Sequence, residues 1–264
     1  MVKEMNNIME YNFNKDVKLF MIFDILGDTE RTGPHLWHIE RDRLEDVKNH
    51  IFDLLLIIRL LKKYLPSDLD YDKINDYIIC HDLPEAITGD ITKFEGVSEE
   101  EINRVTKLSI DYLSEKFGDI MNFETILNNY ENRADIEAKI VHMIDKVHSS
   151  TTFIKYQSES PVDMDAPGII PELRQHPFVV EKIREGKDLA DIFFEFHMKA
   201  VNISFEECQN YGINENYAET IVSTIRGFAA EMYNQKLDGT LLNIRSDFPE
   251  KAMQYNRAKK KENS

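Results

Sequence analysis

The chain has 264 residues, 42% of them hydrophobic and 30% charged, which is the composition of a folded globular protein of one large domain or of one domain with an extension. Its 48 acidic residues outnumber its 32 basic residues and give a formal net charge of −16. Because so acidic a surface repels phosphate backbones, we expect no nucleic-acid polymer as a partner.

Apolar residues recur mostly at helical spacing, without alternating β-branched runs between hairpin turns, so the sequence predicts an all-α fold. Residues 51–65 carry apolar side chains on almost every side of the predicted helix, and Pro66 and Ser67 follow them. A helix that is apolar all round is typical of the centre of a bundle. We therefore expect this helix to be packed on all sides.

A second helix is predicted over residues 71–82, because Pro84 cannot continue it. His81 and Asp82 should therefore lie at a helix end. Pro84 begins a short turn, and Gly89, a residue that tolerates positive φ, closes it. Asp90 should then lie on a loop.

Later helices are predicted from caps and apolar stripes. Ser98 and Glu101 form a capping-box pattern that starts a helix ending near Phe117. Residues 157–177 hold four prolines and a glycine and favour a linker or long loop. Other helices are predicted over residues 132–156, 188–211, 215–235 and 240–257. The buried stripe of the first of these should be Ile136, Ile140, Val141, Ile144, Val147 and Phe153.

The cysteines and apolar windows bear on location. Cys80 and Cys208 lie far apart without CxxC spacing, so we expect neither a disulfide framework nor a thiolate zinc site. The most apolar window, residues 51–61, is shorter than the roughly 20 residues of a membrane span. The first residues lack the features of a signal peptide. We expect a cytoplasmic protein without a membrane partner.

Four residues of metal-ligand type stand where helices could converge: His50, His81, Asp82 and Asp145. Neighbours on a regular helix point about 100° apart, so His81 and Asp82 share an ion most easily at a helix end. Two imidazoles and two carboxylates suit Mn, Fe, Co, Ni or Zn and leave coordination positions for water or a phosphate oxygen. Taken singly, each residue is as readily an ordinary hydrogen-bonded side chain.

Three segments in order resemble the HD-domain metal-dependent phosphohydrolases, and within them the 5'-deoxynucleotidase-like branch. The resemblance covers roughly residues 18–158. The matching positions are Arg43, Glu45, Val47 and His50; His81, Asp82, Glu85, Gly89 and Asp90; and Glu137, Asp145 and Lys146.

The resemblance implies that His50, His81, Asp82 and Asp145 hold one divalent metal ion, which could be Mn, Co, Fe, Ni, Zn or Mg. It also implies that Glu85 and Asp90 are catalytic, since a carboxylate beside the ion can orient water or transfer a proton. The alternatives are a first-turn carboxylate for Glu85 and a loop cap for Asp90. Which carboxylate is the acid stays open.

Residues 31–37 read RTGPHLW and resemble the family's R-T-G-W element, with Pro34, His35 and Leu36 inserted before the tryptophan. The resemblance implies that Arg31 binds phosphate and that Trp37 packs on the sugar. Arg43 is also a plausible phosphate ligand because guanidinium is a fixed bidentate donor, and Lys93 could reach a phosphate. Ion-pairing arginines, a buried tryptophan and a solvated lysine are the alternatives.

His142 and His148 each stand three residues from Asp145, so a second metal is conceivable, but we favour one ion. We expect residues 1–158 to form the HD phosphohydrolase core, residues 159–177 a proline-rich loop or linker, and residues 178–264 a helical extension that packs on the core.

By this resemblance the protein is an enzyme that releases phosphate from nucleotides, with 2'-deoxynucleoside 5'-monophosphates as the expected substrates. The alternatives are hydrolysis of nucleoside triphosphates or other phosphoesters, and a nucleotide-sensing module without turnover. The expected partner is the small nucleotide. The oligomeric state stays open, with a homodimer as the candidate.

Overall fold

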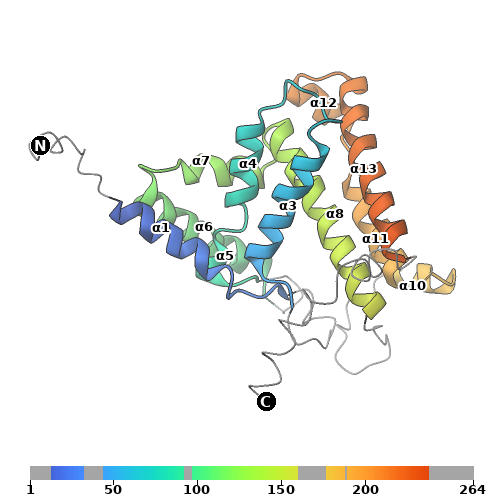
Figure 1. The fold of residues 1–264 in the computed structure, drawn as a ribbon, viewed down its shortest axis with the longest axis horizontal. Helices are drawn as coiled ribbons and strands as arrows, with labels where there is room; N and C mark the ends of the chain where they lie inside the picture. Colours follow the sequence, from blue (N-terminus) through green and yellow to red (C-terminus); the bar gives the residue numbers. More distant parts are fainter. Residues whose placement is uncertain (1–12, 33–43, 92–96, 160–176, 188, 238–264) are drawn as a thin grey trace, which may run out of the picture.

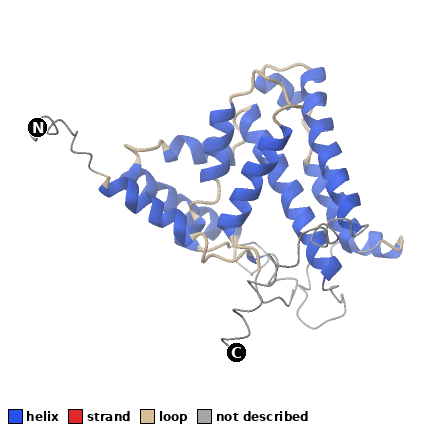
Figure 2. Ribbon diagram, viewed as in Figure 1, coloured by secondary structure: helices blue, strands red, loops and turns tan. Residues whose placement is uncertain are grey.

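The computed structural model describes residues 13–32, 44–91, 97–159, 177–187 and 189–237. Within these ranges the regular structure is helical, which confirms the predicted all-α fold, and the β-type pairing there is one isolated bridge between Glu30 and Asp46 (Figure 2). The helices are α1 Asn14–Ile25, α3 Val47–Leu61, α4 Tyr71–Cys80, α5 Glu85–Thr88, α6 Glu99–Phe117, α7 Phe123–Glu131, α8 Ile136–Glu159, α10 Pro177–Arg184, α11 Leu189–Ala200, α12 Phe205–Tyr211 and α13 Glu215–Leu237.

Short-range signals account for most helix starts. The side chains of Asp46, Asp70 and Ser98 each accept a hydrogen bond from the backbone N–H three residues later and begin α3, α4 and α6. The predicted turn after α4 is confirmed, since α5 starts directly after Pro84 and ends at Gly89, whose φ is +76°. A side chain at Gly89 would be strained at that angle.

Helix α8 lies at the centre of the molecule. It packs against α3, α4 and α7 from the first half of the chain and against α11 and α13 from the second half (Figure 1). All six side chains of its predicted stripe are buried. One apolar core therefore runs through α8 and includes Ile221 and Ile225 of α13.

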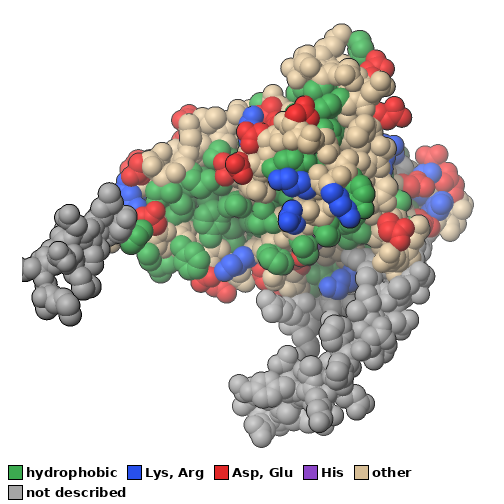
Figure 3. All heavy atoms as spheres, turned by 45° about the horizontal axis from the view of Figure 1, so that its top comes forward, with side chains coloured by type: hydrophobic (Ala, Val, Ile, Leu, Met, Phe, Trp, Pro, Cys, Tyr) green, Lys and Arg blue, Asp and Glu red, His purple; other side chains and the backbone are tan. Residues whose placement is uncertain are grey.

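The expectation that residues 51–65 are packed on all sides is wrong. Phe52, Leu56 and Leu60, spaced four residues apart on one face of α3, are 63%, 47% and 50% exposed. Helix α3 packs mainly on α4 and α8, so its opposite face is left to solvent. Apolar side chains gather on the face of the molecule that Figure 3 shows.

Two predicted helices also differ in their boundaries. The helix predicted over residues 188–211 is two helices, because Ser204 forms a capping box that starts α12 and the preceding Val201 turns into the core. The helix predicted from residue 132 starts at Ile136, since Asn132 is the C-terminal cap of α7, which the apolar pattern did not reveal. The helix predicted over residues 240–257 lies outside the described residues.

The structure also bears on the expectations about membrane spans, cysteines and domain boundaries. In the described part of the chain, no helix has the length and apolar character needed to cross a bilayer. Cys80 and Cys208 are both buried and free. Helices α11 and α13 do pack on α8, but the division at residues 158 and 178 stays a prediction.

Candidate functional site

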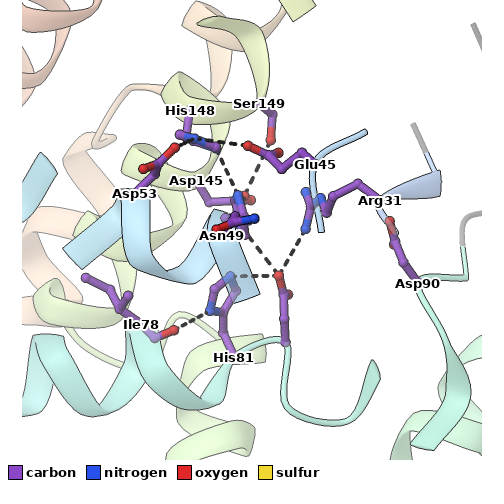
Figure 4. Close-up of polar contacts among 12 residues, drawn as sticks. Arg31, Glu45, Asn49, Asp53, Ile78, His81, Asp90, Asp145, His148 and Ser149 are labelled. Atoms are coloured by element: carbon purple, nitrogen blue, oxygen red, sulfur yellow. Dashed lines mark hydrogen bonds and ion pairs between the residues drawn. The ribbon is translucent and has the colours of Figure 1, made fainter. Parts of the chain in front are cut away.

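Three elements bring the four ligand-type side chains together. His50 lies on α3, His81 and Asp82 follow the end of α4, and Asp145 lies on α8. Figure 4 shows the side chains of His81 and Asp145 among the polar contacts of this region. Nε2 of His50 lies 3.3 Å from Oδ1 of Asp145 and 3.6 Å from Oδ2 of Asp82. Nε2 of His81 lies 3.2 Å from the same Asp82 oxygen. Residues up to 95 positions apart in the chain thus form one buried cluster.

The end of α4 sets the direction of two of these side chains. His81 keeps helical angles and donates its backbone N–H to the carbonyl of Tyr77, so its imidazole points inward like that of a helical residue. Leu83, fully buried, fixes the next turn through its backbone hydrogen bond to Cys80. The adjacent His81 and Asp82 therefore face the same centre, although neighbours on a regular helix point about 100° apart.

The hydrogen bonds of His81 identify the nitrogen that faces the cluster. Its Nδ1 lies 2.9 Å from the carbonyl oxygen of Ile78, which can only accept, so Nδ1 carries a hydrogen and Nε2 of the neutral ring carries a lone pair. Nε2 of His81 and Nε2 of His50 are both buried without a hydrogen-bond partner. Donor atoms of His50, His81 and Asp82 lie within 4.8 Å of one another. Unpaired nitrogens beside carboxylate oxygens are costly unless a cation joins them, so this donor set fits a divalent metal ion.

The charge state of the cluster suits the same ion. Burial, followed by the positive charge of Arg31, lowers the pKa of His50 to about 3, so its imidazole is neutral. Burial raises the pKa of Asp145, but Lys146, whose Nζ lies 2.8 Å from Oδ2, together with His50 and Arg31 outweighs burial and keeps the pKa well below its ordinary value. For His81, burial lowers the pKa, but the charge and hydrogen bond of Asp82 and the charge of Asp145 outweigh burial and raise the pKa above its ordinary value, so a proton competes with a metal ion for Nε2.

Arg31 contacts the cluster through Asp82. Its Nη1 donates to Oδ2 of Asp82 at 3.0 Å, and its backbone N–H donates to the carbonyl of Glu45. Burial lowers the pKa of Arg31, but the charges of Asp82 and Asp145 raise it above the ordinary value, so the guanidinium stays charged. Burial also raises the pKa of Asp82, and His81 and Arg31 together bring it below its usual range.

Asp90 holds the segment that carries Arg31. Its Oδ2 accepts the backbone N–H of Thr32 at 2.6 Å, and its carbonyl accepts the Thr32 hydroxyl. The carboxylate therefore contacts the backbone of Thr32. Its position on the loop after Gly89 agrees with the prediction.

Glu85 begins α5, three residues after Asp82. Burial raises the pKa of its carboxyl well above the ordinary value, and the negative charges of Asp82 and Asp90 raise it further. Its Oε2 is buried without a hydrogen-bond partner. These effects favour the protonated, neutral form of the Glu85 carboxyl beside a charged cluster.

Three further residues that the sequence did not assign to the one-metal site lie next to the cluster: Glu45, Asp53 and His148. Nδ1 of His148 lies 2.9 Å from Nδ1 of His50, and its Nε2 lies 3.1 Å from Oδ2 of Asp53 and 3.6 Å from Oε1 of Glu45. The signal in the sequence that pointed to His148 was its spacing of three residues from Asp145.

His142, the other histidine three residues from Asp145, makes different contacts from His148. His142 stacks on the ring of Tyr130, with centroids 4.2 Å apart, and its Nε2 lies 2.9 Å from the Tyr130 carbonyl oxygen. It is an ordinary packed histidine. Trp37, Arg43 and Lys93 lie outside the described residues, as do the inserted residues 34–36, so the roles of these three candidates stay predictions.

Three curated relatives share sequence with the chain. A 5'-deoxynucleotidase of Xenopus laevis is 22% identical over 142 residues, which are 53% of this chain and 69% of the relative. One of Saccharomyces cerevisiae is 30% identical over 122 residues, or 44% of this chain and 50% of the relative. One of Schizosaccharomyces pombe is 26% identical over 180 residues, or 64% of this chain and 88% of the relative.

A solved structure and a family model add to these likenesses. A conserved hypothetical protein from Pyrococcus furiosus is 20% identical, with a TM-score of 0.48 over 64% of this chain and 99% of that one. The family model described as HD domain matches residues 23–169, which include His50, the His81-Asp82 pair and Asp145. Since this match covers more than half of the sequence, the chain belongs to the HD-domain family.

Proposed function

We propose that this protein is a metal-dependent phosphohydrolase that converts 2'-deoxynucleoside 5'-monophosphates into deoxynucleosides and phosphate. The observation that carries the proposal is the buried cluster itself, in which two imidazole Nε2 atoms and two carboxylates face one point beside a charged guanidinium. The nucleotide class rests on the three relatives, each named a 5'-deoxynucleotidase.

The ligands of the ion would be His50, His81, Asp82 and Asp145. When bound there, a divalent ion lowers the pKa of water and neutralises charge on a phosphate oxygen. The two imidazoles favour Mn, Fe, Co, Ni or Zn over Mg, which prefers ligand sets made entirely of oxygen.

Arg31 is suited to bind the substrate phosphate. Its Nη1 is engaged by Asp82, and the guanidinium has further N–H groups that can donate to a phosphate oxygen. Because Asp90 holds the backbone of Thr32, we assign Asp90 to the positioning of Arg31. The phosphate would then lie between this arginine and the metal ligands.

Glu85 is suited to act as the general acid. Water attacks phosphorus, the bond from phosphorus to O5' breaks, and the departing O5' needs a proton. Burial and two neighbouring carboxylates raise the pKa of this carboxyl well above its ordinary value and so favour its protonated form. Glu85 would donate that proton to O5' and recover it from the attacking water.

The proposal is tested by measuring phosphate release from matched ribo- and deoxyribonucleoside 5'-mono-, di- and triphosphates with Mn, Co, Fe, Ni, Zn or Mg added. We expect the fastest release from deoxynucleoside monophosphates and no release after chelation. Release from triphosphates alone would replace the monophosphate assignment with the triphosphate one. Metal binding without release from any nucleotide would contradict enzymatic function and support a sensing module.

A further inference from the structure

We infer that His148 is a positioning residue that fixes the proton of His50 on Nδ1, so that the lone pair of His50 Nε2 faces the metal position. This inference rests on the proposed metal site. It concerns a chain of three side chains, Asp53, His148 and His50, which we call the imidazole relay.

The direction of the hydrogen bonds in the relay follows from what each atom can do. The Asp53 carboxylate, whose pKa is lowered by its hydrogen bond to His148, can only accept, so Nε2 of His148 at 3.1 Å must donate. A neutral imidazole with its hydrogen on Nε2 has a lone pair on Nδ1. That lone pair lies 2.9 Å from Nδ1 of His50, which therefore donates.

Without the relay, His50 would have a different preferred tautomer. Its Nε2 faces two carboxylate oxygens, at 3.3 Å on Asp145 and 3.6 Å on Asp82, and these oxygens favour a hydrogen on Nε2. A hydrogen there occupies the lone pair that a metal ion needs. His148 accepts a hydrogen bond from Nδ1 of His50 and therefore opposes the tautomer of His50 that carries its hydrogen on Nε2. The His50 ring is fully buried.

The tautomers of the two histidines of the cluster are therefore fixed by different hydrogen-bond acceptors. His81 donates to the backbone carbonyl of Ile78, which no side-chain substitution removes. His50 donates to a side chain on another helix, 98 residues away in sequence, which substitution can change. Glu45 lies 3.6 Å from Nε2 of His148 and can replace Asp53 in part, so the effect of changing Asp53 should be smaller than that of changing His148.

The test compares three variants of the full chain. His148→Leu removes the acceptor, and His148→Asn retains one because its amide oxygen stands near the place of Nδ1. His142→Leu is the matched control, since it removes a histidine of the same helix that bonds to the Tyr130 carbonyl. The readouts are the dissociation constant and stoichiometry for Co(II), by competition with a chromophoric chelator, and the tautomer of His50 in the metal-free protein, by nitrogen NMR.

We expect His148→Leu to bind Co(II) about 10- to 100-fold more weakly, with the His50 hydrogen moved from Nδ1 to Nε2. His148→Asn and His142→Leu should both stay close to wild type in affinity. In the wild-type protein, the hydrogen of His50 should be found on Nδ1 before any metal is added, which tests the relay even if a variant fails to fold.

Several results would overturn the relay. One is unchanged Co(II) affinity in His148→Leu, and another is a wild-type His50 with its hydrogen on Nε2. Two Co(II) ions per wild-type chain and one in His148→Leu would make His148 a ligand of a second ion. Failure of the wild-type protein to bind Co(II) at all would contradict the proposed function instead, while the tautomer measurement would still decide the relay.

Discussion

Nη1 of Arg31 lies 3.0 Å from Oδ2 of Asp82, and the same oxygen faces Nε2 of His81 at 3.2 Å and Nε2 of His50 at 3.6 Å. One carboxylate oxygen thus joins the candidate phosphate ligand to two candidate metal ligands. Loss of its charge should affect both metal binding and turnover.

The first prediction concerns that charge. Asp82→Asn keeps the size of the side chain but makes it neutral, so we expect metal content and phosphate release to fall together. Elemental analysis of the purified variant, paired with the release assay, measures both. Normal metal occupancy in Asp82→Asn would remove Asp82 from the ligand set.

The second prediction separates substrate binding from metal binding. Arg31→Met should keep its metal but lose kcat/KM by about 10- to 100-fold, the effect of one or two charge-assisted hydrogen bonds, mostly through a higher KM. Lys15→Met is the control, because Lys15 forms an exposed ion pair with Asp119 far from the cluster in sequence. An unchanged KM in Arg31→Met would exclude Arg31 as a phosphate ligand.

The third prediction concerns the proton donor. Glu85→Gln should retain its metal and lose about 10²- to 10⁴-fold in kcat on nucleotides, the usual contribution of general acid–base catalysis. The loss should be much smaller on p-nitrophenyl phosphate, whose leaving group needs no proton. An equal loss on both substrates would argue that Glu85 acts on the attacking water, and loss of metal would make it a ligand.

The fourth prediction concerns acid stability. Burial lowers the pKa of His142 to about 4, while a histidine in the unfolded chain titrates near 6.5. Between these values the unfolded state binds the proton and the folded state does not, so the free energy of unfolding falls as the pH falls.

His142→Gln should therefore reduce the slope of unfolding free energy against pH by up to about 1.4 kcal/mol per pH unit between pH 6 and 4.5. Denaturant titrations of the metal-free protein at several pH values measure it. His197, whose pKa burial also lowers to about 4, should add a second contribution of the same sign. A slope that does not change in His142→Gln would show that this histidine is protonated in the folded protein.

Local signals in the sequence determined much of the helical framework. The caps at Asp46, Asp70 and Ser98 act on a backbone N–H three residues away, and Pro84 with Gly89 sets a turn of a few residues. These effects operate within one turn of a helix, so they do not depend on the rest of the fold. The end of α4 and the loop position of Asp90 were therefore predictable.

The tertiary structure decided what depends on neighbours from elsewhere in the chain. The residue types and order of His50, His81, Asp82 and Asp145 are read from the sequence, but the contact between His50 and His148 exists only because α3 packs on α8. The exposed face of Phe52 and Leu56 depends in the same way on which helices cover α3. Burial and contact across 98 residues are set by the packing of whole helices against one another, and periodicity within one helix cannot specify its partners.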